Sequence, residues 1–217
     1  MAEPVAPNVA PGALGNSRPA RDLETVARRK RMIDSAVDLA IIGGYDAVQM
    51  RDVAARAEVA IGTLYRHYPS KDHLLLAALA EQATALRERL AQRPPEGTDA
   101  AARTTDVLRR ASRALTRRPE LTAALVTALS SPESDTAGFK QDVEEVLRAI
   151  ITTAIDGADI PAPDGVVRTL GYVWLAVLSA WVSGTLDAQQ MTADLETAAG
   201  LLLDRQRIDA ISMKPHA

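Results

Sequence analysis

The chain contains no cysteine, and aromatic residues make up only 3% of its 217 positions. Without cysteine, no disulfide can cross-link the fold and no thiol can act as a nucleophile. This absence fits a reducing cytoplasm, so we expect a cytoplasmic protein. Extended alternation of β-branched residues is missing too, whereas alanine, leucine and arginine are abundant. The composition therefore favours an all-α fold, and the length suffices to bury a core.

The sequence signatures of several enzyme classes are also missing. The chain has no H-E-x-x-H, no P-loop, no G-x-G-x-x-G and no G-x-S-x-G. None of the three histidines, His67, His73 and His216, has neighbours that would complete a catalytic set. Adjacent carboxylates such as Glu144 and Glu145 diverge by about 100° on a helix, which suits solvent exposure rather than acid–base chemistry. Metal-ligand spacings are absent, so we expect no enzyme, no metal and no cofactor.

Charge is absent from the eighteen residues between Thr169 and Leu186. That length approaches the requirement for a transmembrane helix. However, two glycines and several hydroxyl groups interrupt the stretch, no Lys/Arg cluster flanks it, and the chain has no second stretch like it. The first residues also lack the positive start of a secretory signal. We therefore interpret the stretch as a helix buried on most sides and expect no membrane partner.

Prolines, glycines and composition divide the chain into four parts. Residues 1–20 hold four prolines and no apolar core, which predicts a disordered arm. Residues 21–75 form a small domain, called the reader below. Residues 76–207 form a larger domain, called the body, and residues 208–217 form a flexible tail.

Charge is unevenly spread, although the net charge of the whole chain is only −3. Residues 18–71 hold ten Lys or Arg against seven Asp or Glu, whereas residues 72–217 hold fifteen against twenty. A basic end on an acidic chain suits a protein whose small domain meets nucleic-acid phosphates. The asymmetry is modest and supports that function without establishing it.

Apolar periodicity and helix-breaking residues predict about nine helices. In the first, Ile33, Ala36, Val37, Ala40 and Ile41 recur at the spacing of a helix packed on a core. The expected helices cover about 22–42, a short stretch before residue 58, then 61–67, 71–93, 100–117, 120–129, 137–156, 164–186 and 191–206.

The stretch 43–71, GGYDAVQMRDVAARAEVAIGTLYRHYPSK, is the most informative part of the chain. Its two leading glycines stop the first helix, because glycine adopts the left-handed conformation at little cost. A short helix, a three-residue break at 58–60 and a second short helix at 61–67 follow. Pro69 ends that helix, and Ser70 is expected to cap the next one by accepting a backbone N–H. This order predicts a helix-turn-helix, whose second helix enters the major groove of DNA.

The run Gly62–Lys71, GTLYRHYPSK, resembles the DNA-binding domain of the TetR family of bacterial repressors, in which T-L-Y-x-[HY]-[FY] precedes a lysine. Within that family the reader is similar to that of actinobacterial regulators of cholesterol catabolism. The segment VWLAVLSAW at 173–181 resembles the long C-terminal helix of the same regulators. The resemblance implies three helices in the reader, six in the body, and repression from a palindromic operator. One departure is Glu58, which stands in the turn where the family commonly has glycine.

The resemblance also implies which reader residues contact double-stranded DNA. Thr63 and Tyr65 match family positions that touch the backbone or bases, and His67 matches a frequent phosphate donor. Lys71 lies in the first turn of a helix, where its ammonium and the backbone amides suit a phosphate. Leu64 and Tyr68 alternate with this outward set and are expected in the core. The candidate DNA-binding residues are Gln49, Arg51, Gly62, Thr63, Tyr65, His67 and Lys71.

A single reader contacts too few phosphates for strong binding at physiological salt, so we expect a homodimer that spans two half-sites. The last two long helices are the candidates for the interface. On the final one, Leu195, Ala198, Ala199 and Leu202 form an apolar stripe that Leu201 and Leu203 widen. The alternative is that these residues close the core of a single chain.

The body of a ligand-responsive repressor should hold a pocket for a small-molecule effector. Two tryptophans seven residues apart stand on nearly the same face of one helix. With other apolar residues they could line a cavity, although an ordinary packed core would use the same residue types. The candidate pocket residues are Leu125, Val126, Leu129, Phe139, Val143, Val146, Leu147, Ile150, Tyr172, Trp174, Leu178 and Trp181.

The chemistry of the effector is open at this stage. The resemblance suggests a hydrophobic molecule such as a sterol- or fatty-acid-derived coenzyme A thioester. Arg109, Arg113 and Arg117 recur every four residues on one helix and could receive its phosphates, or they could form a solvated basic stripe. A ligand-independent DNA-binding or architectural protein, with a solid core in place of a cavity, is the alternative function.

Overall fold

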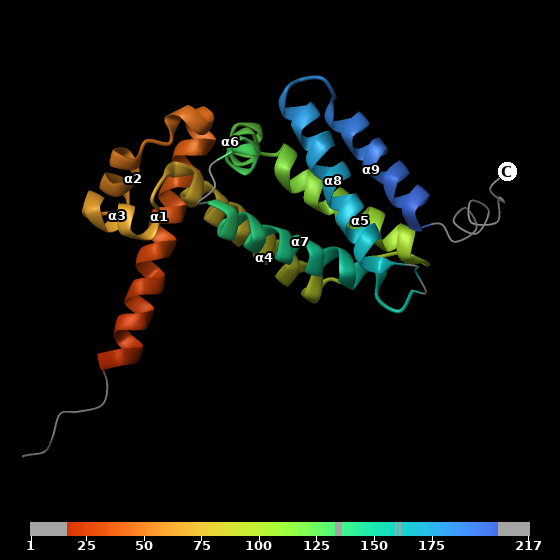
Figure 1. The fold of residues 1–217 in the computed structure, drawn as a ribbon, viewed down its shortest axis with the longest axis horizontal. Coiled ribbons are helices and arrows are strands. Elements are labelled where there is room, and N and C mark those ends of the chain that lie inside the picture. The colour runs from red at the N-terminus through yellow and green to blue at the C-terminus, as the bar shows by residue number, and fades with distance from the viewer. Residues whose placement is uncertain (1–16, 133–135, 159, 161, 204–217) are drawn as a thin grey trace, which may run out of the picture.

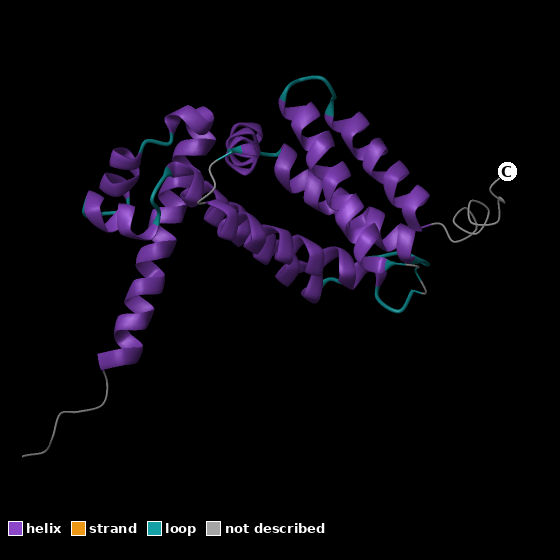
Figure 2. Cartoon of the chain, viewed as in Figure 1, coloured by secondary structure: helices purple, strands orange, loops and turns teal. Residues whose placement is uncertain are grey.

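The computed structural model describes residues 17–132, 136–158, 160 and 162–203, and this part of the chain forms nine helices and no strand (Figures 1 and 2). The prediction of an all-α fold with about nine helices is confirmed. The helices are α1 Ser17–Ala47, α2 Met50–Arg56, α3 Ile61–His67, α4 Lys71–Gln92, α5 Ala100–Thr116, α6 Pro119–Ser130, α7 Ala137–Ile155, α8 Pro163–Val182 and α9 Ala188–Leu203.

The helix ends differ from the sequence prediction at a few places. Helix α1 begins at Ser17, so residues 17–20, which we assigned to a disordered arm, are helical. The remainder of that arm and the predicted tail at 208–217 lie outside the described residues. Helix α8 ends at Val182 rather than 186, because the chain turns at Gly184, which has a left-handed φ of 74°.

The reader is built from α1–α3 and the first turn of α4. The regular geometry of α1 breaks at Gly43 and Gly44, and Gly44 adopts φ 65° and ψ −154°, as the glycine pair predicted. The chain then reverses into the two short helices (Figure 1). Their buried side chains meet α1 in one core, to which the reader contributes Met32, Ile33, Ala36, Ala40, Val48, Val53, Ala54, Ala57, Leu64, Tyr68, Leu74 and Leu75.

Helix α6 completes the reader core although it belongs to the body in sequence. Its residues Leu121, Ala124, Leu125 and Ala128 are buried in the same cluster as the reader side chains. Figure 1 shows α6 between the reader and the rest of the body, and α6 packs on α1, α4 and α8. The two domains therefore share this hydrophobic cluster, which continues from the reader into α6.

A second cluster joins α5, α7, α8 and α9, and a third joins α4, α5 and α7. Leu195, Ala199 and Leu203 of α9 are buried in the second cluster. This placement corrects part of the predicted dimer stripe, because these three residues close the core of a single chain. The opposite face of α9 is exposed at Ala193, Thr197 and Leu201.

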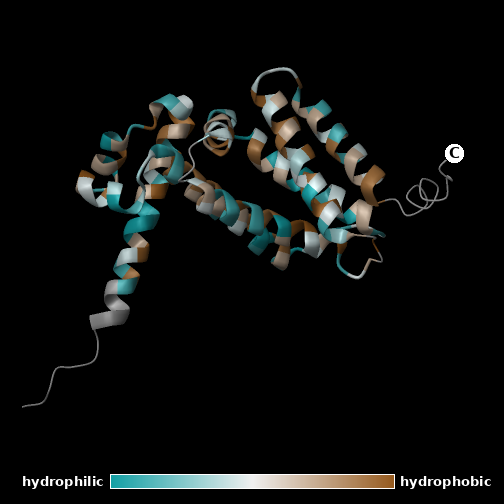
Figure 3. Cartoon of the chain, viewed as in Figure 1, coloured by the Kyte–Doolittle hydropathy of each residue, from teal (hydrophilic) through white to brown (hydrophobic). Residues whose placement is uncertain are grey.

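Helix α8 is less covered than the sequence predicted. Only 22% of its most apolar 18-residue window is buried in the single chain, so the expectation of burial on most sides is wrong for this chain alone. Its length and hydropathy satisfy the requirement for a membrane span, but such a helix is equally typical of a soluble bundle. In Figure 3 apolar residues alternate with polar ones along α8 and α9.

Candidate DNA-binding surface and effector cavity

The turn between α2 and α3 takes the tight form of a helix-turn-helix. Glu58 adopts a left-handed φ of 55°, although it is not a glycine. The backbone N–H of Val59 donates to the carbonyl of Ala54 at 3.0 Å, which closes the turn behind it. The strained residue is therefore accommodated by a hydrogen-bonded turn and by the packing of the two helices on α1.

Helix α3 separates into a buried and an open face, as predicted. Leu64 is fully buried and Tyr68 is 5% exposed, so both are core residues. The side chain of Tyr65 is 49% exposed on the other face. Among the remaining candidate DNA-binding residues, Gln49, Arg51 and Gly62 are exposed, and Thr63, His67 and Lys71 are half-buried.

Gly62 lies where a partner can approach closely. A Cβ added to Gly62 would meet nothing of the chain itself within 4 Å, so the fold does not require glycine there. Gln49 precedes α2, and its side-chain amide donates to the carbonyl of Asp46 at 2.8 Å. That hydrogen bond holds the side chain of Gln49 against the preceding turn, at the edge of the reader.

Lys71 and Asp72, at the start of α4, are both held by Tyr45. The Tyr45 hydroxyl donates to Oδ1 of the buried Asp72 at 2.6 Å. The Lys71 ammonium lies 3.7 Å from the centroid of the Tyr45 ring and donates to the Tyr45 carbonyl at 3.3 Å. These contacts tie α4 to the segment after the Gly44 kink. Phosphate contact by Lys71 stays a prediction.

The N-cap of α4 differs from the prediction. Ser70 has the extended backbone of an N-cap residue, but its hydroxyl makes no capping hydrogen bond to a backbone N–H. It pairs instead with Nδ1 of His73 at 2.9 Å. The ring of His73 packs edge-on against Phe139 of α7, with centroids 5.3 Å apart. The start of α4 is thus anchored to the body as well.

His67 lies in a basic environment at the end of α3. Burial lowers its pKa below the usual value, and the nearby charges of Arg29, Arg66 and Arg28 lower it further. The imidazole is consequently less protonated near neutral pH than a free histidine would be. A surface with this concentration of positive charge suits an anionic partner.

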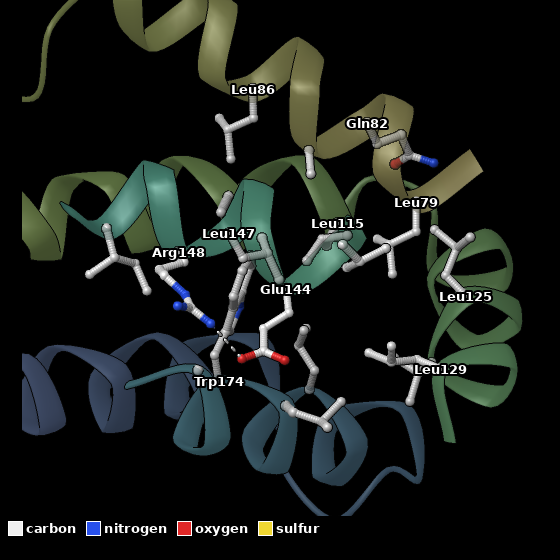
Figure 4. A pocket seen from close by; sticks show the side chains of 18 of the residues that line it. Leu79, Gln82, Leu86, Leu115, Leu125, Leu129, Glu144, Leu147, Arg148 and Trp174 are labelled. Atoms are coloured by element: carbon white, nitrogen blue, oxygen red, sulfur yellow. Dashed lines mark hydrogen bonds and ion pairs between the residues drawn. The ribbon is translucent and has the colours of Figure 1, made fainter. Parts of the chain in front are cut away.

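The body holds a cavity of about 410 Å³, partly open to solvent, between α4, α5, α6, α7 and α8 (Figure 4). Most of its wall is aliphatic, as expected for a small-molecule site. Eight candidate pocket residues line it, namely Leu125, Val126, Leu129, Val143, Leu147, Tyr172, Trp174 and Leu178.

The other four candidates lie outside the cavity lining. Phe139 stacks against the rings of His73 and Tyr68 at the junction with the reader. Val146 and Ile150 belong to the cluster between α4, α5 and α7, and Trp181 packs on the second cluster of the body. These four residues follow the same helical periodicity as the lining residues, but their side chains pack against neighbouring helices instead of the cavity.

The cavity wall contributed by α4 was missed in the sequence. Leu79, Gln82, Ala83 and Leu86 line the cavity and recur at i, i+3, i+4 and i+7. This stripe could have been found, but we interpreted the helix only as the link between the domains. On α5, the lining residues are Ala111, Ala114 and Leu115, whereas Arg109 and Arg113 do not line the cavity.

Arg109 instead pairs with Glu196 of α9, at 2.6 Å between Nη2 and Oε1. Other charged side chains do border the cavity. These are Arg89, Lys140, Arg148 and Arg168, together with Glu144 and Asp164. Arg148 and Glu144 form an ion pair at 3.1 Å (Figure 4). The charge at the cavity is therefore mainly positive.

Comparison with known proteins finds a family match in each of the two domains. Residues 32–78 match the family model for bacterial regulatory proteins of the tetR family, and residues 97–202 match that for the tetracyclin repressor-like C-terminal domain. The HTH-type transcriptional repressor KstR of Rhodococcus jostii is 38% identical over 178 residues, covering 81% of this chain and 82% of that protein. The chain belongs to the TetR family. It is a transcriptional regulator and not an enzyme.

Two solved TetR-family structures show how far the similarity extends. A TetR regulator from Rhodococcus superposes with a TM-score of 0.76 at 32% identity, covering 84% of this chain and 98% of that one. The FadR repressor of Thermus thermophilus, solved with lauroyl-CoA, has a TM-score of 0.60 at 20% identity and covers 87% of this chain and 96% of that one. The latter shows the shared TetR fold alone.

Proposed function

We propose that this TetR-family chain is a cytoplasmic, dimeric repressor that binds a palindromic operator and is released by a small hydrophobic effector. The observation that carries the proposal is the double role of α6. Leu125 belongs to the core that the reader shares with α6, and it also lines the cavity. A ligand that displaces this side chain acts on the packing of the reader.

The open face of the reader supports the DNA part of the proposal. Tyr65 and its neighbours Gly62 and Thr63 stand on the side of α3 away from the core. Arg51 and Gln49 lie at the start of α2, where a side chain can reach phosphate or a base edge. The basic surroundings of His67 favour the same partner.

The outer faces of α8 and α9 support the homodimer. Tyr172, although it also lines the cavity, is 68% exposed, and Leu201 is 50% exposed. The exposed positions of α9 at 193, 197 and 201 carry no charge. Apolar side chains of this size gain from removal from water. Small residues at Ala176 and Ala193 allow a second chain to approach closely. Pairing these faces across a two-fold axis would cover the part of α8 that one chain leaves open.

The cavity supports an apolar effector with an anionic end. Its wall is aliphatic, while Arg89, Lys140, Arg148 and Arg168 border it. A coenzyme A thioester joins these two chemistries, because its acyl chain is apolar and its phosphates pair with cations. The lauroyl-CoA complex of FadR shows that the TetR fold accepts such a molecule. Anion contact is thus reassigned from Arg109 and Arg113 to the residues bordering the cavity.

The test is to capture fragments of the source genome with purified protein at physiological salt and to sequence them. A recurrent inverted repeat is expected, bound with the stoichiometry of a dimer in sedimentation experiments. Long-chain acyl-CoA should then lower the affinity for that repeat. Only scattered, salt-sensitive fragments would contradict the operator, and an affinity unaffected by any acyl-CoA would favour the ligand-independent alternative.

A further inference from the structure

Two buried side-chain nitrogens in the cavity wall have no hydrogen-bond partner within the described part of the chain. They are Nε1 of Trp174 and Nε2 of Gln82, and both residues line the cavity. Trp174 is 9% exposed overall, and it belongs to the buried cluster of α5, α7, α8 and α9. A buried donor left unsatisfied typically costs about 1–3 kcal/mol. Such a cost calls for an explanation at each site.

The indole nitrogen of Trp174 is the more informative of the two. An indole N–H can only donate a hydrogen bond, so no change of tautomer or amide orientation removes its need for an acceptor. The packing of the ring fixes where that acceptor must lie. Gln82 carries both a donor and an acceptor on its amide, which makes it adaptable. In Figure 4 these residues extend from α8 and α4, on different sides of the cavity.

The chemistry of the wall restricts which acceptor fits. A hydroxyl group would bring a hydrogen that needs its own acceptor, which the indole cannot supply and which the wall offers only at polar residues such as Gln82 and Glu144. An anion would lose its hydration at a high cost unless it reached the cations that border the cavity, and the ring of Trp174 packs among apolar side chains instead. A carbonyl oxygen only accepts hydrogen bonds and is small and neutral. It therefore satisfies an indole N–H without needing any further hydrogen-bond partner from the wall.

We propose that Trp174 determines effector specificity by donating a hydrogen bond from Nε1 to a carbonyl oxygen of the bound ligand, with Gln82 as a second polar contact. This inference rests on the proposed role of the cavity as the effector site. The carbonyl has two possible sources, a thioester group or a ketone within the apolar part. In either case, a ligand without a carbonyl group leaves the indole N–H of Trp174 without a hydrogen-bond acceptor.

The test compares three ligands of equal chain length by titration calorimetry. Dodecanoyl-CoA carries a thioester carbonyl, S-dodecyl-CoA carries none, and S-(6-oxododecyl)-CoA carries a ketone in the chain. Each is titrated into the full-length protein and into Trp174→Phe, which keeps an aromatic ring but removes the N–H. Trp181→Phe is the matched control, because Trp181 is the other tryptophan of the chain, on the same helix and outside the cavity lining.

The expected result is that Trp174→Phe weakens one carbonyl-bearing ligand about 10-fold and changes binding of S-dodecyl-CoA by less than about 2-fold. Loss for dodecanoyl-CoA identifies the thioester as the acceptor, and loss for the oxo ligand identifies the ketone. Trp181→Phe should leave all three affinities unchanged. Gln82→Leu provides a second variant and should show a smaller loss for the same ligand.

Two outcomes would overturn the inference, and they differ in what they say of the proposed function. If Trp174→Phe weakens all three ligands equally, or none, then Trp174 contributes only shape and the cavity remains an effector site. If none of the three ligands binds the unmodified protein, both the hydrogen bond and the acyl-CoA effector are wrong. Operator binding, measured separately, is unaffected by either result.

Discussion

The reader and the body differ in how completely side chains fill their interiors. In the reader, α1–α3 pack around side chains such as Met32 and Leu64, which are fully buried. In the body, five helices surround a cavity of about 410 Å³ and leave Nε1 of Trp174 unpaired. The side chains of the reader therefore fill its interior, whereas the body retains an unfilled cavity and an unpaired hydrogen-bond donor that a ligand could use. This difference is what a sensor joined to a rigid DNA-binding element requires.

The same substitution in the two regions should expose this difference most strongly. Leu64→Ala removes a fully buried side chain from the reader core and should destabilise the protein by about 3 kcal/mol, within the usual range for buried leucines. Leu147→Ala removes a half-buried side chain from the cavity wall and should cost about 1 kcal/mol. Urea unfolding followed by circular dichroism measures both. Equal losses would mean that the cavity wall is packed as tightly as the reader.

A second pair of variants separates the frame of the reader from its DNA surface. Tyr45→Phe removes the hydroxyl that donates to buried Asp72, and should lower the free energy of unfolding by about 1–3 kcal/mol. Tyr65→Phe alters an exposed residue and should change stability by less than about 0.5 kcal/mol while weakening operator binding. Thermal unfolding and gel-shift titration are the two measurements. A loss of stability in Tyr65→Phe would show that the Tyr65 hydroxyl makes a stabilising contact within the protein, contrary to the exposed position of this side chain.

The turn of the reader should tolerate a glycine better than its present residue. Glu58 has a left-handed φ of 55°, which costs a non-glycine residue on the order of 1 kcal/mol. Glu58→Gly relieves that strain but gives the unfolded chain more freedom, so a net gain of about 0.5 kcal/mol is expected. Differential scanning calorimetry would detect the rise in Tm. Glu58→Ala, which keeps the strain, is the control and should show no rise.

The smallest effect concerns pH. Because burial and the neighbouring arginines lower the pKa of His67, its protonated form is disfavoured in the free protein. Contact with a phosphate would raise that pKa, so operator binding should take up a proton and tighten as the pH falls. Fluorescence anisotropy between pH 5.5 and 8 measures the slope. The slope should decrease in His67→Gln, and an unchanged slope would remove His67 from the phosphate contacts.

Much of the reader could be predicted from the sequence because its signals are local. The glycine pair at 43–44 stops a helix, the bounds of α3 follow from Pro69 and the turn before Ile61, and the alternation on α3 separates Leu64 and Tyr68 from the open face. Backbone chemistry within a few residues decides each of these features. The exception was Ser70, whose hydroxyl pairs with the side chain of His73.

The cavity was predicted only in part, because apolar periodicity shows which face of a helix is buried but not what covers it. Phe139 and Val143 lie one helical turn apart on α7, yet Phe139 packs on His73 and only Val143 lines the cavity. The unpaired nitrogen of Trp174 has no sequence signal at all. Both facts depend on the relative placement of distant helices.

Helix α6 also limits how far the two domains can be separated by engineering. The reader core needs Leu121 and Ala124, which lie well beyond the sequence boundary at residue 75. A chimera that joins residues 1–75 to the body of another regulator would therefore place an unmatched helix against α1. The unit that can be exchanged is the reader together with the facing side of α6. We therefore expect that a chimera cannot take its operator preference from one regulator and its effector response from another unless α6 matches both domains.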